Sequence, residues 1–265
     1  MNIYAELTTR FNKGRLRAIL AGGQAVVLHR LAVMSKDGDW VIRQDEETTA
    51  HILDVLQSFN ARYRFGAPLD ARWLGGGWSS HFEFAYDGLR VRTDFVSRPP
   101  RLCSSDLKRL WEGRDQEKIP LTPPRELAEM KKTNREKDYA VIGELARIMN
   151  RAEDQLLYSR SARDLIALAQ AHPITAEALA DRRPLLRVFG AGRADVEAAL
   201  DAERRQLIHA NEDRLIRYMT AAQKWAEAWS AVSAEVADKP LIEANRIMRA
   251  RAENLLPYTV EGGLP

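Results

Sequence analysis

The sequence predicts a mixed α/β (α+β) fold that is followed by a mostly helical region. Over the first 100 residues, short apolar runs typical of strands alternate with segments whose apolar residues recur at helical spacing. Residues 125–256 are rich in Ala, Leu and Arg, and their spacing is helical almost throughout. A stretch rich in proline and charge, 97–124, separates the two parts. We therefore expect an α/β domain over residues 1–122 and a helical domain over residues 123–265.

The predicted elements of the first domain are short strands and amphipathic helices. An apolar run at 16–20 ends at Gly22-Gly23, which indicates a buried strand and a tight turn. Asp87-Gly88 separates two segments of alternating polarity and predicts a two-residue β-hairpin turn. The elements expected in order are strand 16–20, helix 24–31, strand 40–42, helix 46–59, strand 61–65, and strands 81–86 and 89–96. They form a small mixed sheet with helices packed on it.

Helices are predicted throughout the second domain. Trp225 and Trp229 lie four residues apart on one of them, alongside Ile216 and Met219. Such a stripe is typical of a buried core or of an interface between chains, so the helical region is expected to hold a second copy or a partner protein. The helices are expected near 123–132, 134–149, 151–171, 174–182, 194–232 and 240–254.

The composition suits a globular protein of the cytoplasm. The 265 residues include 40 Lys and Arg against 37 Asp and Glu. The net charge of +3 is compatible with an anionic ligand such as a nucleotide but is too small to predict nucleic-acid binding. Cys103 is the only cysteine, so no internal disulfide can form. Because the start lacks a signal-peptide layout and no apolar run approaches the ~20 residues of a membrane helix, we expect no membrane partner.

Three carboxylates lie where a cleft could form. Asp37 and Asp39 are two residues apart at the start of a predicted strand, so both side chains point to one face. Asp94 lies on the polar face of strand 89–96, where a salt bridge with Arg92 is the alternative interpretation. Clustered carboxylates repel one another unless a cation lies between them, and hard oxygen ligands suit Mg²⁺. The pattern indicates a two-ion Mg²⁺ site for phosphoryl chemistry, with Asp37, Asp39 and Asp94 as ligands.

A glycine turn precedes these acids. Gly22-Gly23 lies between a predicted strand and helix, where backbone N–H groups and the helix dipole favour a phosphate. The order of strand, Gly-Gly, helix, Asp-x-Asp and a later strand Asp resembles the signature of the DNA polymerase β-like nucleotidyltransferase superfamily. The segments that carry the resemblance are 21–26, 35–40 and 93–96.

A second similarity lies in the helix near 127–145. It contains Lys131 and then Arg135-Glu136-Lys137-Asp138. Many small bacterial members of the superfamily, including those of toxin–antitoxin and abortive-infection systems, carry a similar Lys…Arg-x-Lys-Asp helix after the catalytic sheet. The resemblance covers roughly residues 10–150.

The resemblance implies a fold, a reaction and a role for each residue. The reaction would be Mg²⁺-dependent transfer of a nucleoside monophosphate from an NTP to a hydroxyl acceptor on a protein, an RNA end or a small molecule. Asp37 and Asp39 would hold the metal that carries the triphosphate. Asp94 would help to bind the second metal and to deprotonate the acceptor. The residues implied to bind phosphate are Gly22, Gly23, Ser35, Lys131 and Lys137.

Two further functions stay open. Gly38 replaces the bulky apolar residue usual between the first two acids, and an upstream Arg is missing, so a non-catalytic nucleotidyltransferase-fold module, acting as an antitoxin or assembly partner, is the first alternative. Arg204 and His209 match the Arg-x₄₋₆-His spacing of HEPN-type ribonucleases, in which His acts as acid or base and Arg stabilises the phosphate. A solvated surface helix is the other explanation for that pair.

Overall fold

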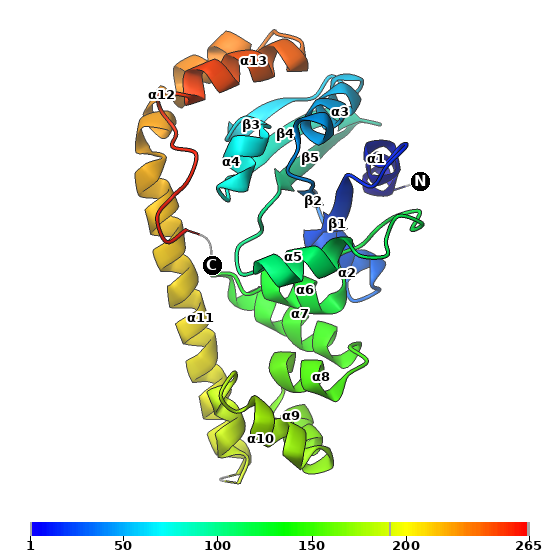
Figure 1. Ribbon diagram of the computed structural model, residues 1–265, viewed down its shortest axis with the longest axis vertical. Coiled ribbons are helices and arrows are strands. Elements are labelled where there is room, and N and C mark those ends of the chain that lie inside the picture. The colour runs from blue at the N-terminus through cyan, green and yellow to red at the C-terminus, as the bar shows by residue number, and fades with distance from the viewer. Residues whose placement is uncertain (1, 191, 264–265) are drawn as a thin grey trace. The chain divides into compact units, whose positions relative to one another are not determined.

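The computed structural model describes residues 2–190 and 192–263 and shows the mixed α/β fold that the sequence predicts (Figure 1). The chain divides into two compact units. Unit 1 consists of Met1–Thr122 together with Arg214–Pro265, and unit 2 consists of Pro123–Asp213. Within the described ranges, no helix is both long and apolar enough to cross a bilayer.

A five-stranded mixed sheet forms the centre of unit 1. Its strands are β1 (Ala18–Ala21), β2 (Asp37–Ile42), β3 (Arg62–Gly66), β4 (Ser80–Tyr86) and β5 (Leu89–Val96). Their order across the sheet is β1-β2-β5-β4-β3. The β2–β5 pair is parallel and the other pairs are antiparallel. The predicted hairpin at Asp87-Gly88 is confirmed, because β4 and β5 pair through it from Tyr86 opposite Leu89.

The helices of unit 1 begin where capping residues allow. Asp45 caps α3 by accepting a hydrogen bond from the Thr48 backbone N–H, and two acids follow in the first turn, where the helix dipole favours them. The helices within this unit are α1 (Ile3–Phe11), α2 (Gly22–Leu28), α3 (Glu46–Gln57), α4 (Ala71–Gly75), α5 (Ser104–Trp111), α12 (Gln223–Val236) and α13 (Leu241–Ala252). Helix α11 (Arg193–Ala221) crosses the boundary between the units.

One face of the sheet is apolar and the other is polar. Alternation along the strands sends Trp40, Phe82 and Phe95 into the core, where the rings of Trp40 and Phe95 stack at 5.4 Å. Helices α1 and α3 cover this apolar face (Figure 1). Phe11 of α1 packs edge-on against Trp40. The opposite face therefore presents the charged side chains of the same strands.

The C-terminal segment packs with the sheet of unit 1 rather than with the helices of 123–213. Trp225 is buried and donates its indole N–H to the carbonyl of Gly66 at 3.0 Å. Trp73 and Trp78 donate in the same way to the carbonyls of Leu256 and Pro257, at 3.0 and 2.8 Å. The helical domain expected over 123–265 is thus divided at Asp213, because the apolar faces of α12 and α13 complete the core of unit 1.

Unit 2 is wholly helical and has its own core around Leu156, Leu165 and Val196. The single helix expected over 151–171 is two helices, because Ser161 caps the second one by accepting from the Asp164 N–H. Likewise, the helix expected over 194–232 is divided into α11 and α12 at Ala222. The elements of unit 2 before α11 are α6 (Pro124–Met130), α7 (Glu136–Arg147), α8 (Ala152–Tyr158), α9 (Ala162–Ala171), α10 (Pro173–Leu179) and the short η1 (Pro184–Val188).

Candidate functional site

The three acids singled out by the sequence lie on one face of two adjacent strands. Asp39 of β2 is the direct partner of Asp94 of β5, and neighbouring strands lie about 4.8 Å apart. Asp37 is two residues before Asp39 and therefore shares its face, opposite Arg92. The parallel pairing of β2 with β5 thus brings together carboxylates that are distant in the sequence.

The glycine turn lies directly against this group. Gly22 has φ of +56°, and a Cβ added to it would lie 1.8 Å from Oδ2 of Asp39. A Cβ on Gly23 would lie 2.2 Å from Oγ of Ser35, whose carbonyl accepts a hydrogen bond from the Gln24 side chain at 2.8 Å. Only glycine permits this approach, so Gly22 and Gly23 lie directly against Asp39 and Ser35.

Asp94 has a close hydrogen-bond partner, whereas Asp37 has only a distant ion-pair partner. Oδ1 of Asp94 accepts from Nδ1 of His81 at 2.7 Å and lies 3.6 Å from the guanidinium of Arg64. Arg92 lies 3.8 Å from Asp37, so the alternative pairing of Arg92 with Asp94 is not the observed one. Oδ1 of Asp37 and Nη1 of Arg64 are buried and lack a hydrogen-bond partner among the described residues.

This donor set suits a hard cation in part. Among the residues that the structure describes, no group of three or more His, Cys, Asp or Glu side chains is arranged to hold a metal ion. Mg²⁺ is usually bound through one or two carboxylates, with substrate phosphates and water completing its coordination. The facing pair Asp39 and Asp94 fits that mode, and so does Oδ1 of Asp37, which accepts no hydrogen bond from the described residues and lies 3.8 Å from Arg92.

No motif in the sequence points to His81 as a site residue, although the predicted hairpin determines which residue it faces. A two-residue turn at Asp87-Gly88 fixes the register so that His81 faces Asp94. The second ring nitrogen, Nε2, lies 2.7 Å from Oγ of Ser79. Asp94, His81 and Ser79 therefore form a continuous hydrogen-bonded chain on the polar face.

Lys131 and Lys137 belong to unit 2, whereas the acids and the glycine turn belong to unit 1. Lys131 follows α6, and its ammonium lies 3.7 Å from Oδ1 of Asp138. Lys137 is exposed in the first turn of α7. The phosphate-binding role implied for these two lysines stays a prediction.

Arg204 and His209 lie on α11 without facing each other. Five positions at 3.6 residues per turn separate them by about 140° around the helix axis. Arg204 pairs with Asp201 at 3.0 Å, and His209 lies 3.3 Å from Glu212. Within a single chain, these contacts fit a solvated helix face.

Gly38 is required by packing. A Cβ at this position would lie 2.4 Å from the ring of Tyr4 and 2.5 Å from the ring of Trp40. The ring of Tyr4 thus takes the space of a bulky residue between the acids, and its hydroxyl donates to the carbonyl of Lys36 at 2.6 Å. Burial, and then the negative charge of Asp37, raise the pKa of Tyr4.

The stripe expected to serve as core or interface is divided between core and exposed surface. Trp225 is buried, and Trp229 packs edge-on against Phe65 with ring centroids 5.6 Å apart. Ile216 and Met219 of α11 are exposed. The two tryptophans therefore anchor α12 to the edge of the sheet at β3.

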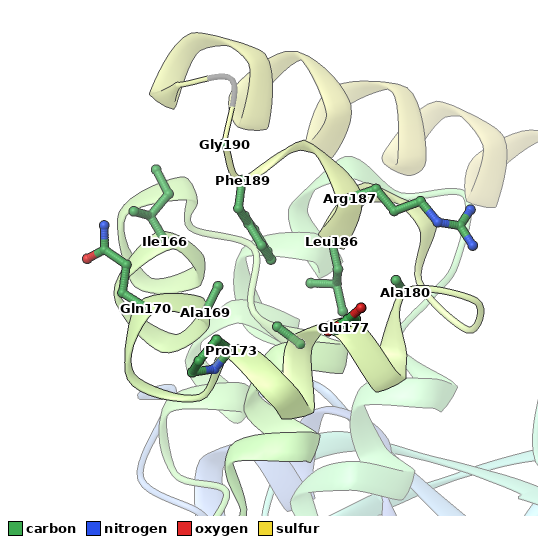
Figure 2. Close-up of a pocket in the computed structure, with 11 residues that line it drawn as sticks. Ile166, Ala169, Gln170, Pro173, Glu177, Ala180, Leu186, Arg187, Phe189 and Gly190 are labelled. Carbon is green, nitrogen blue, oxygen red and sulfur yellow. The ribbon is translucent and has the colours of Figure 1, made fainter.

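A different kind of hollow lies in unit 2. An open cavity of 480 Å³ is lined by Ile166, Leu186 and Phe189, and Figure 2 shows the side chains of Leu186 and Phe189 pointing into it. Glu177 and Arg187 also line it. This mainly apolar lining suits apolar contact more than triphosphate chemistry.

The comparisons with known proteins leave the family open. No family model matches the chain, and neither does a curated protein or a solved structure. The resemblance to nucleotidyltransferases therefore rests on the motifs in the sequence, and the function has to be argued from the site.

Proposed function

We propose that this protein is a Mg²⁺-dependent nucleotidyltransferase that moves a nucleoside monophosphate from an NTP to a hydroxyl acceptor. The observation that carries the proposal is the row formed by the Gly22 turn, Asp39 and Asp94 across neighbouring strands. A phosphate-binding turn beside two facing carboxylates is the arrangement that metal-assisted phosphoryl transfer needs.

The residues of the site have different roles in the proposed reaction. The backbone of Gly22 and Gly23, with the hydroxyl of Ser35, binds the β- and γ-phosphates at the start of α2. Asp37 and Asp39 hold the cation that accompanies the triphosphate, and Asp94 orients the acceptor side. Mg²⁺ supplies charge neutralisation on the phosphate oxygens when it is bound.

The electrostatics of the face support this assignment. Asp39 and Asp94 are direct partners across two strands, and like charges opposite each other destabilise a sheet. Sites that cost stability in this way are commonly sites of function, because a bound cation removes the repulsion.

The experiment compares α- and γ-labelled nucleotides. The protein is incubated with Mg²⁺ and each [α-³²P]NTP in a cell extract, and the protein and RNA fractions are separated. Relative to the extract alone, the added protein should increase label from [α-³²P]NTP but not from [γ-³²P]NTP, because the nucleotidyl group and not the terminal phosphate is transferred. Asp37→Ala combined with Asp39→Ala should abolish labelling.

The matched control removes two exposed carboxylates, Asp54→Ala combined with Asp238→Ala, and should label like wild type. Equal labelling by wild type and the Asp37/Asp39 variant would show that these acids do not carry the reaction. Calorimetry with Mg²⁺ and each NTP, in the same buffers, tests the binding step alone.

A second candidate is a non-catalytic module with the same fold. It is favoured by the charged partners that Asp37 and Asp94 have in Arg92 and Arg64, and by the finding that the described residues include no three-ligand metal cluster. No heat with any nucleotide in the calorimetry, together with no labelling by wild type, would favour this module over the enzyme.

A further inference from the structure

The chain Asp94–His81–Ser79 has the connectivity of an activated nucleophile. A carboxylate bonded to Nδ1 of a histidine fixes the tautomer, so that Nε2 can accept a proton from a hydroxyl. Here Nδ1 of His81 lies 2.7 Å from Asp94 Oδ1, and Nε2 lies 2.7 Å from Ser79 Oγ. The Ser79 hydroxyl is thus the donor to His81.

The backbone holds this chain in place. The carbonyl of Ser79 accepts from the Ala67 N–H at 2.9 Å. Gly66, with φ of +108°, lies so close that an added Cβ would be 2.6 Å from the His81 ring and 2.6 Å from the Ser79 carbonyl oxygen. On the other side, the indole of Trp78 is bonded to the carbonyl of Pro257. Ser79 is partly exposed.

The position of Ser79 suits an in-line displacement. Across the sheet, the register partners run Ala21, Asp39, Asp94 and His81, with the Gly22 turn following Ala21. If that turn holds the leaving pyrophosphate, the attacking oxygen must approach the α-phosphorus from the side opposite the turn. Ser79 Oγ contacts His81, which lies at the opposite end of the row from the turn.

We propose that Ser79 is an acceptor within the chain and that the protein nucleotidylates itself at this hydroxyl; this inference rests on the proposed nucleotidyltransferase function. Ser79 Oγ forms a bond to the α-phosphorus of the NTP, and the bond from that phosphorus to the α–β bridging oxygen breaks. Pyrophosphate leaves, and the Ser79 proton passes to Nε2 of His81. The product is a phosphodiester between Ser79 and the nucleoside.

Two readouts test the inference on the full-length protein. The first is the intact mass after incubation with Mg²⁺ and each NTP, with the site located by peptide mass spectrometry; the mass before incubation is recorded because modification during expression would already occupy Ser79. We expect a gain of one nucleoside monophosphate on Ser79. Ser79→Ala should not gain it, whereas Ser58→Ala, which removes an exposed serine hydroxyl elsewhere, should gain it fully.

The second readout needs neither metal nor nucleotide. A fluorophosphonate should form an adduct at Ser79 of the wild type, and His81→Asn should slow this reaction by roughly 100-fold or more, because the general base is lost. No adduct at Ser79, or one that forms equally fast in His81→Asn, overturns the inference.

The failures of the two proposals are distinguishable. A wild type that binds Mg²⁺ and NTP in calorimetry but gains no mass at Ser79 overturns the inference and leaves the nucleotidyltransferase proposal intact. A gain that persists in Ser79→Ala also overturns it. A wild type that neither binds nor transfers any nucleotide removes both proposals.

Discussion

Asp39 and Asp94 face each other as direct partners in the parallel pair β2–β5, and the turn at Gly22 contacts the first of them. Two carboxylates on one face of neighbouring strands, whose backbones lie about 4.8 Å apart, are a source of repulsion in the free protein and a source of affinity for a cation. Bound Mg²⁺ and NTP should therefore raise the free energy of unfolding, and the size of this rise should depend on each of the two acids.

Asp39→Asn should weaken ligand binding without lowering the free energy of unfolding of the free protein. The amide keeps the shape of the side chain but removes a charge, so the free energy of unfolding without ligand should stay equal or rise. In wild type, Mg²⁺ with an NTP at 100 times its Kd should add about 2.7 kcal/mol. Thermal denaturation with and without ligand measures both quantities. A ligand-induced rise in Asp39→Asn as large as in wild type would contradict the assignment.

Gly22→Ala should be more costly than an alanine at another glycine of positive φ. Gly14 has φ of +89° and no atom within 4 Å of an added Cβ, whereas Gly22 meets Asp39 Oδ2 at 1.8 Å. Gly14→Ala should lose about 1–2 kcal/mol from backbone strain alone. Gly22→Ala should lose about 1–3 kcal/mol more from the collision. Urea denaturation of the two variants measures the difference, and equal losses would show that the turn can move away from Asp39.

The local parts of this site were predictable from turn and strand patterns, whereas the convergence of the three acids could be expected only from the resemblance. Asp87-Gly88 fixed the hairpin and with it the facing of His81 and Asp94, since a two-residue turn leaves one register. The parallel pairing of β2 with β5 joins segments that are distant in the sequence, and no periodicity encodes which strands pair. The requirement for Gly38 was also hidden, because it depends on the ring of Tyr4 from α1.

The return of the C-terminal helices to unit 1 was hidden for the same reason. An amphipathic pattern shows that α13 must bury one face but does not show which surface covers it. Individual hydrogen bonds hold α13 on this surface. The Tyr63 hydroxyl, for example, donates to Asn245 of α13 and accepts a hydrogen bond from the Leu69 N–H at 2.9 Å.

Asp70 should make stability depend on pH. It caps α4 by accepting from the Arg72 N–H at 2.9 Å and pairs with Arg249 of α13 at 2.7 Å. Burial raises the pKa of this carboxyl, but hydrogen bonds from Arg72 and the charge of Arg249 outweigh burial, so the pKa lies below its ordinary value of 3.8. Because the folded pKa is depressed, the stabilisation is present above pH 3.8 and is lost as pH falls through the folded pKa.

Two substitutions divide the roles of Asp70. Asp70→Asn keeps an acceptor for the helix cap and removes the charge, so its deficit relative to wild type should shrink when the pH drops below 3.8. Asp70→Ala should lose about 1 kcal/mol more than Asp70→Asn at neutral pH, because the cap is gone as well. Urea denaturation at both pH values decides this, and a deficit of Asp70→Asn that does not change with pH would contradict the ionic role.

Glu203 should be the most sensitive charge in unit 2. Its carboxylate accepts from Arg183 at 2.9 Å through both Nε and Nη2 and also accepts from Arg160. Arg183 is 3% exposed. Burial raises the pKa of Glu203, but the two guanidinium groups outweigh it and hold the pKa below its ordinary value. The carboxylate is therefore charged at neutral pH, and it neutralises two guanidinium groups that are largely buried, with 3% and 10% of their side chains exposed.

Glu203→Gln should accordingly lose about 3–5 kcal/mol, because it leaves the two arginines buried without a counter-charge. Glu197→Gln is the matched control: it removes an exposed carboxylate that pairs with Arg193 on the same helix, and it should lose at most about 1 kcal/mol. Hydrogen exchange of the amides in 123–213 measures the effect in unit 2 itself. Equal protection in the two variants would mean that water enters the Glu203 cluster and solvates the arginines once the charge is removed.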